Sequence, residues 1–290
     1  MTVTRRRFLA IAAAFAGSPA FAQRHSWQGF ALGAEVNITL TGPTELARPI
    51  LERALELIKD VEAAFSLYDP ASALSQLNKT KQLKPSEQFY TLMTLADAAH
   101  RATDGLFDPT VQPLWQALAE GSTTDKDRQA IGWERVAFTP SLISLQPEQA
   151  LTFNGIAQGF ATDLVAELLD ANRFDTALIN IGEYRSTGGA WRLGLKNAQH
   201  GLLGQRTLTH GAIATSDTGA SPLGARGHIL HPTALPKWSS VTVEADTAAW
   251  ADALSTALTL APLDQVQAIT AAADLRRVTL VSFDGELTTL

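Results

Sequence analysis

The sequence of 290 residues contains no cysteine, and this absence excludes several kinds of site at once. Disulfide bonds, thiolate metal sites, a cysteine nucleophile and a lipid anchor on cysteine are all ruled out. Basic charge is also scarce, because 23 Lys and Arg residues stand against 29 Asp and Glu residues, a net charge of −6. A nucleic-acid-binding protein needs a basic face to neutralise phosphates, so we expect no nucleic-acid partner. Stability must come from burying a hydrophobic core, which a chain of this length can supply.

The N-terminus carries a short apolar stretch with the layout of a targeting signal. Three arginines at 5–7 precede the apolar residues 8–17, and an A-x-A cleavage pattern follows at 20–22. The stretch is too short to span a bilayer. The letters TRRRFLA resemble the twin-arginine export signal, and a nonspecific basic anchor is the alternative. We therefore expect a signal peptide over 1–22, one mature domain over 23–290, and a periplasmic location.

Hydrophobic periodicity predicts a mixture of helices and strands without strict βαβ alternation. Alternation predicts an edge strand over 33–40, helical spacing predicts a helix over 44–65, and turn residues predict a connector over 66–78 and a surface loop over 121–128. Further helices are expected around 92–102, 157–169, 247–260 and 262–273, and further strands near 134–138, 142–145, 150–153, 176–182, 191–195, 206–215 and 239–245. A hairpin is expected to turn at Asp284-Gly285. This order predicts the α+β class with mostly antiparallel sheets, in one catalytic domain with room for two lobes.

A turn of small residues, NGIAQG at 154–159, lies between an apolar run and a helix pattern. Gly155 and Gly159 permit close backbone approach, and a helix N-terminus offers free N–H groups with a partial positive charge. The turn therefore predicts a phosphate or diphosphate site. It matches neither a Rossmann nor a Walker motif, so a structural turn without a ligand is the alternative.

Two other segments hold groups with possible chemistry. In TAAWADALSTAL (247–258), Asp252 and Thr256 are four residues apart and share one helix face. Carboxylate and hydroxyl oxygens suit Mg²⁺, and a plain Asp–Thr hydrogen bond is the alternative. In GARGHILHP (224–232), His228 or His231 is a candidate general base or phosphate contact, and an ordinary loop histidine is the alternative.

The order of these segments resembles the ApbE family, the FAD:protein FMN transferases. The segments that carry the resemblance are Leu32-Gly33-Ala34, FSLYDPASALSQLN (65–78), GLFDPTVQPLWQAL (105–118), GIAQGFATD (155–163), NIGE (180–183), TSD (215–217), HILHP (228–232) and ADALSTAL (251–258). Together they run through nearly the whole mature chain. The resemblance implies an ApbE-like fold and an enzyme that cleaves FAD between its phosphates.

The resemblance also implies roles for particular residues. Asp252 and Thr256 would be side-chain ligands of Mg²⁺, and the Gly155 carbonyl would complete the metal site. His228 would be the base that accepts the proton of the acceptor hydroxyl. The FAD pocket would be lined by Leu32, Tyr68, Phe107, Asp108, Thr152, Gln158 and Ile229. The products would be AMP and a partner protein with FMN on a Ser or Thr, and we expect this partner to be a subunit of a membrane redox complex.

The chain departs from the family pattern at several positions. Gln158 stands where the family usually has Lys, which removes a positive charge close to FAD. The other departures are Thr152 for an acidic residue, Asp217 for Gly, His231 for Asp, and a single Gly182 followed by Glu183 in place of paired glycines. They leave two alternatives to the transferase open: an FAD-binding carrier or maturation protein without transfer activity, and an enzyme that hydrolyses FAD to FMN and AMP.

Overall fold

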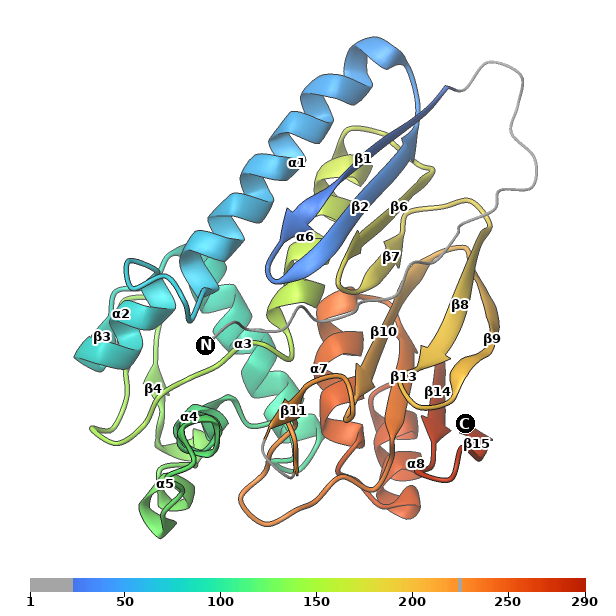
Figure 1. Cartoon of the computed structure of the whole chain (residues 1–290). Helices are drawn as coiled ribbons and strands as arrows, with labels where there is room; N and C mark the ends of the chain where they lie inside the picture. The colour runs from blue at the N-terminus through green and yellow to red at the C-terminus, as the bar shows by residue number, and fades with distance from the viewer. Residues whose placement is uncertain (1–22, 224–225) are drawn as a thin grey trace.

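An eight-stranded sheet forms the centre of the computed structural model, which describes residues 23–223 and 226–290. The strand order is β1-β2-β6-β7-β10-β13-β14-β15, and every neighbouring pair is antiparallel (Figure 1). The strands are β1 Arg24–Ala31, β2 Ala34–Thr41, β6 Ala177–Ile181, β7 Tyr184–Ser186, β10 Gly211–Asp217, β13 Ser240–Ala245, β14 Arg277–Val281 and β15 Leu287–Thr289. The predicted α+β class with antiparallel sheets is confirmed. The predicted signal peptide lies outside the described residues.

Helices cover one side of this sheet and extend into a smaller group of elements beside it (Figure 1). The α-helices are α1 Thr44–Phe65, α2 Ala73–Thr80, α3 Glu87–Ala102, α4 Gln112–Glu120, α5 Asp125–Gln129, α6 Ala157–Ala171, α7 Ala248–Leu258 and α8 Leu263–Ala272, and the 3-10 turns are η1 Pro109–Val111 and η2 Trp133–Arg135. Three small sheets pair β3 Gln82–Leu83 and β4 Ala137–Phe138 with β5 Ile143–Ser144, β8 Trp191–Asn197 with β9 Gly201–Leu208, and β11 Pro222–Leu223 with β12 Arg226–Gly227. Within the described residues, no helix is both long and apolar enough to cross a membrane.

The long helices agree with their predicted ranges, whereas the prediction was wrong in several shorter segments. The strand predicted at an edge, β2, lies between β1 and β6, because β1 pairs with its outer side. The predicted connector at 66–78 contains the start of α2, whose first turn is capped by the Ser72 hydroxyl. The predicted loop at 121–128 contains the start of α5, and residues 150–153 form no strand. The strand expected at 206–215 is two strands, β9 and β10, with a turn between them.

Helix α7 lies between two hydrophobic cores, which explains its alanine-rich sequence. Ala253 and Ala257 belong to the core that α1, α3 and α6 form against β2 and β6. Leu254 and Leu258 belong to the core between α7, α8 and strands β10, β13 and β14. Small side chains let neighbouring elements approach α7 closely from both sides. The helix that carries the predicted metal ligands is therefore held rigidly.

Helices α6 and α7 hold each other through two reciprocal caps. The Asp252 carboxylate of α7 accepts the N–H of Gly159 in the first turn of α6, at 3.1 Å. The Asp163 carboxylate of α6 accepts the N–H groups of Ala248 and Ala249 in the first turn of α7, at 2.7 and 2.8 Å. The first N–H groups of a helix have no partner within the helix, so each carboxylate satisfies groups that would otherwise be buried unpaired.

We expect Gly159→Ala to destabilise the protein, because the two helix backbones meet at this glycine. An added Cβ would lie 2.4 Å from the Ala248 carbonyl oxygen and 2.7 Å from the Ala249 Cα. The backbones must move apart, which should lower the free energy of unfolding by about 1–3 kcal/mol. Urea unfolding monitored by circular dichroism measures the loss. The matched control is Gly204→Ala, where an added Cβ meets open space, and equal midpoints for the two variants would contradict the expectation.

Candidate active site

A cavity of about 580 Å³ opens between the start of α6, helix α7, strand β10 and the β8–β9 hairpin. Its volume is in the range of sites for cofactors and small molecules. Nine of the eleven residues predicted to form the site line this cavity: Phe107, Asp108, Thr152, Gly155, Gln158, His228, Ile229, Asp252 and Thr256. They come from four segments that are far apart in the sequence. The fold thus brings together most of the site that the sequence predicted.

The other two predicted residues, Leu32 and Tyr68, do not line the cavity. Tyr68 is 82% exposed. Leu32 forms the turn between β1 and β2, with Gly33 and a backbone φ of 51°. Its carbonyl accepts the side-chain amide of Gln158 at 3.1 Å, so it supports a cavity residue without lining the cavity itself. Contact of Leu32 and Tyr68 with FAD stays a prediction.

Gln158 lies against the backbone at the end of β6 as well as against Leu32. An added Cβ on Gly182 would come within 2.6 Å of the Gln158 amide carbon. Gly182 also has a φ of 90°, a conformation that side-chain-bearing residues rarely adopt. The Gln158 amide therefore ties the first turn of α6 to two neighbouring loops, where it brings no charge to the cavity.

Gly155 and Thr256 meet at one corner of the cavity. An added Cβ on Gly155 would lie 3.0 Å from the Thr256 hydroxyl, so the backbone comes this close because the residue is glycine. The Ser216 hydroxyl lies 3.1 Å from that of Thr256 and 2.9 Å from that of Ser255. The corner is therefore rich in neutral oxygen atoms.

Two buried carboxylates, those of Asp252 and Glu183, line the cavity near this corner. One oxygen of Glu183 accepts the N–H of Thr215 at 3.0 Å. Burial raises the pKa of Asp252 to about 7, which the hydrogen bond from Gly159 only partly offsets. Burial, and then the charge of Asp252, raise the pKa of Glu183 well above its ordinary value. Among the ion pairs of the described residues, none involves either group.

These residues fit a Mg²⁺ ion. Buried charges are normally paired or bound to a metal, and a cation near Asp252 would remove the cost of ionising two carboxylates in one cavity. The Asp252 carboxylate, the Thr256 hydroxyl and the Gly155 carbonyl are hard oxygen ligands, and Mg²⁺ commonly keeps water and substrate phosphate as its other ligands. In the described part of the chain, no three His, Asp or Glu side chains converge on one point, as the protein ligands of a zinc site usually do.

Asp108 also forms part of the cavity wall, and hydrogen bonds hold its side chain in place. Its carboxylate accepts the N–H of Thr110 at 2.8 Å, the Thr110 hydroxyl at 2.6 Å and the N–H of Trp133 at 3.3 Å. Burial raises its pKa, and the bonds from Thr110 oppose the rise. Thr152 joins the same wall, because its N–H donates to the Pro109 carbonyl at 2.9 Å.

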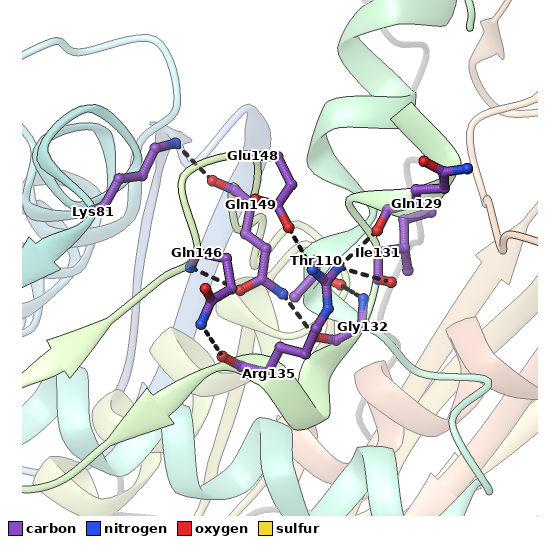
Figure 2. Close-up of polar contacts among 9 residues, drawn as sticks. All are labelled: Lys81, Thr110, Gln129, Ile131, Gly132, Arg135, Gln146, Glu148 and Gln149. Carbon is purple, nitrogen blue, oxygen red and sulfur yellow. Dashed lines mark hydrogen bonds and ion pairs between the residues drawn. The ribbon is translucent and has the colours of Figure 1, made fainter. Parts of the chain in front are cut away.

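A network of polar contacts anchors this wall to the smaller group of elements (Figure 2). The Thr110 hydroxyl accepts the N–H of Gly132, whose carbonyl accepts the buried side-chain amide of Gln149. The Gln149 carbonyl in turn accepts Lys81 at 2.7 Å. Around this chain of bonds, Arg135 contacts Glu148, Gln129, Ile131 and Gln146. The position of Asp108 thus depends on contacts that reach well beyond the cavity.

The turn NGIAQG differs in one respect from its prediction. Gly155 faces the cavity, as expected, but Gly159 contacts the backbone of α7 and does not line the cavity. The N–H of Gly159 is bound by Asp252. The prediction that both glycines admit a ligand was therefore wrong for Gly159, because helix packing requires it to be small.

Several polar residues of the cavity were not predicted as site residues, among them Asn180, Glu183 and Ser216. The buried Oδ1 of Asn180 has no hydrogen-bond partner among the described residues, so a bound donor would satisfy it. These three residues lie in the short segments NIGE and TSD, which carry part of the resemblance to the family. The spacing of these residues in the sequence does not identify them as site residues, because only the pairing of β6, β7 and β10 brings them together.

A sequence profile of the ApbE family matches residues 32–279. The chain belongs to the ApbE family. This ApbE-family chain is also similar to curated proteins named FAD:protein FMN transferase. The relative from Klebsiella pneumoniae is 25% identical over 212 residues, which cover 67% of this chain and 66% of the relative. The relative from Chlamydia muridarum is 26% identical over 235 residues, which cover 70% of this chain and 73% of the relative.

Solved structures of the family share the ApbE fold of this chain. The ApbE protein from Thermotoga maritima has a TM-score of 0.81 and 25% identity, over 92% of this chain and 96% of that protein. The flavin transferase ApbE from Vibrio cholerae has a TM-score of 0.81 and 24% identity, over 93% and 97% of the two chains. The predicted ApbE-like fold is therefore confirmed.

Proposed function

We propose that this protein is an exported FAD:protein FMN transferase. It attaches the FMN half of FAD through a phosphoester to a Ser or Thr of a partner protein and releases AMP. The observation that carries the proposal is the single cavity in which His228, Asp252, Thr256 and the Gly155 turn meet. Membership of the ApbE family and the names of the relatives support the same activity.

Each group has a role in phosphoryl transfer. The acceptor hydroxyl attacks the FMN phosphorus, a new P–O bond forms, and the P–O bond to AMP breaks as AMP leaves with the bridging oxygen. The imidazole of His228 takes the proton of the attacking hydroxyl. Asp252, Thr256 and the Gly155 carbonyl would hold Mg²⁺, which would supply positive charge to offset that of the diphosphate. The buried side chains of Phe107 and Ile229 offer an apolar wall of the cavity to the substrate.

The partner and the compartment are part of the proposal. The twin-arginine-type sequence at residues 1–22 supports export to the periplasm. A transferase there meets the periplasmic parts of membrane proteins, so we propose a subunit of a membrane redox complex as the acceptor.

The test incubates the protein with FAD, Mg²⁺ and an acceptor domain that carries a flavinylation site, and then weighs the acceptor and measures AMP. We expect the acceptor to gain the mass of FMN less one water, with one AMP released for each FMN attached. Asp252→Ala is the inactive control. AMP release without an acceptor would identify an FAD hydrolase, and tight FAD binding without AMP release would identify a carrier protein.

We expect Gln158→Lys to strengthen FAD binding. The side chain at 158 lines the cavity and lies against Gly182, so an ammonium group there would attract the diphosphate. The dissociation constant for FAD should fall about five- to tenfold, from a charge-assisted hydrogen bond of about 1–1.4 kcal/mol. Quenching of flavin fluorescence measures the affinity. Gln158→Met, which removes the amide without adding charge, is the control, and equal affinity of the Lys and Met variants would contradict the expectation.

A further inference from the structure

The segment that carries His228 runs from residue 228 to 239 without helix or strand. Three of its members, His228, Ile229 and Leu230, line the cavity. A loop of this length has few backbone hydrogen bonds of its own, so side chains have to fix its shape. The half-buried side chain of His231 lies three residues after His228 in this segment.

The His231 ring closes a tight turn within this loop. Its Nδ1 accepts the N–H of Ala234 at 2.9 Å and the N–H of Thr233 at 3.2 Å, and the Thr233 hydroxyl lies 3.3 Å away. A ring nitrogen that accepts hydrogen bonds carries no proton. In the neutral imidazole the proton is then on Nε2, which becomes a donor.

The other side of the ring faces the turn that ends at Asp108. The backbone of Gly105 acts on the ring from this side and favours its protonated form, as a carbonyl oxygen that faces the donating Nε2 would. Asp108 and His100 are the titratable groups that act on the ring from this turn and from α3. On the outer side, Arg128 of α5 donates to the Pro232 carbonyl at 3.1 Å.

We infer that His231 is a positioning residue whose neutral ring joins the His228 loop to the Gly105–Asp108 turn across the cavity wall. This inference rests on the proposed transferase function for its consequence in catalysis. Nδ1 sets the shape of the loop, Nε2 sets its distance from the turn, and together they place His228 relative to Asp108. Asn and Gln each keep one half of this bridge. Asn can accept at the position of Nδ1, whereas Gln can reach the position of Nε2 as a donor.

Acid should open the bridge. Burial lowers the pKa of His231 below its ordinary value, which Asp108 and the Gly105 backbone only partly offset. A lowered pKa keeps the ring neutral at neutral pH, so the bridge is complete there. As the pH falls through this lowered pKa, Nδ1 gains a proton and can no longer accept from Thr233 and Ala234.

Hydrogen exchange of the amides of residues 233 and 234 tests the bridge without any reference to activity. In the wild type we expect protection factors at pH 8 about tenfold higher than at pH 5. At both pH values, His231→Gln should show the low protection that the wild type has at pH 5. His231→Asn should show the high protection that the wild type has at pH 8, again at both pH values. The control is His210→Asn, an exposed histidine outside both the cavity and the loop, which should behave like the wild type. Equal protection in the wild type and His231→Gln would overturn the inference.

Transfer kinetics test the consequence for His228. His231→Asn and His231→Gln should each lower kcat about tenfold, the usual effect of one lost buried hydrogen bond, while the FAD dissociation constant changes less than threefold. The acid limb of the wild-type kcat profile that comes from His231 should be missing in His231→Asn. Unchanged kcat in both variants would overturn the positioning role. A wild type that shows the exchange pattern but transfers no FMN would refute the proposed function and leave the bridge intact.

Discussion

Asp252→Asn should abolish FMN transfer and, in the absence of metal, stabilise the protein at pH 8. Transfer should fall at least about 1,000-fold, because the variant loses the one carboxylate among the proposed Mg²⁺ ligands. Stability should rise because Asp252 and Glu183 are buried together without a cation partner among the described residues. The Asn side chain can still accept the N–H of Gly159, so the cap of α6 remains.

The pH dependence of stability follows from the same pair. The pKa of Asp252 rises from 3.8 to about 7 on folding, so between these values the folded protein keeps a proton that the unfolded chain has lost. The contribution of Asp252 to stability without metal therefore falls as the pH rises through this window, and it is constant above the window. Glu183 acts in the same direction. The loss from Asp252 is roughly 2–4 kcal/mol. Mg²⁺ should restore stability at pH 8 in the wild type and have no such effect in Asp252→Asn.

Urea unfolding in EDTA at pH 5 and pH 8, with and without added Mg²⁺, measures these effects. Asp60→Asn removes an exposed carboxylate on α1 and is the matched control for charge. Equal stability of the metal-free wild type at both pH values would show that the pair does not oppose folding. Transfer by Asp252→Asn with Mg²⁺ would remove Asp252 from the proposed metal site.

The helices could be predicted closely because each one repeats apolar residues over many turns. α1 coincides with its predicted range, since Ile50, Ala54, Ile58 and Val61 form one buried stripe. Strand β1 was not predicted because its sequence shows no regular pattern of buried apolar residues. Its residues are mostly exposed or half-buried, and it pairs at the edge of the sheet. Short elements such as α2 and α5 are too brief for periodicity to mark them.

The candidate site shows the same division between local and long-range information. The motifs identified Asp252, Thr256 and Gly155 through their order in the chain, and the cavity contains all three. The sequence could not show that Asp252 caps a helix 93 residues away or that Glu183 shares its cavity. These contacts depend on how β6, β7, β10 and α7 pack against one another, and this packing cannot be predicted from any single segment of the sequence.

Asp163→Ala should be the most destabilising of the substitutions considered for this protein. The carboxylate is buried, accepts two N–H groups at the start of α7 and pairs with Arg185. Alanine would leave the two N–H groups and a guanidinium without their partner. Breaking a buried pair in this way costs about 3–5 kcal/mol.

Asp163→Asn removes the negative charge of the side chain but keeps a hydrogen-bond acceptor, so it tests the two contributions to stability separately. Burial raises the pKa of Asp163 despite the opposing effect of Arg185 and the two N–H groups, so its charge is itself costly. Asn keeps one acceptor for the start of α7, and its loss of stability should be only about 1–2 kcal/mol. Asp170→Ala, which removes an exposed carboxylate on the same helix, should change stability by less than about 0.5 kcal/mol.

Asp163 should affect transfer even though it does not line the cavity. It fixes the N-terminus of α7, and the same helix carries Asp252 and Thr256 one and two turns further on. A shift of this end would misplace both proposed metal ligands, so we expect Mg²⁺ affinity to fall in Asp163→Ala under conditions where the variant is still folded. Melting curves that coincide for Asp163→Ala and Asp170→Ala would contradict the reciprocal caps. A large loss of stability with unchanged Mg²⁺ affinity would show instead that α7 keeps its position without the cap.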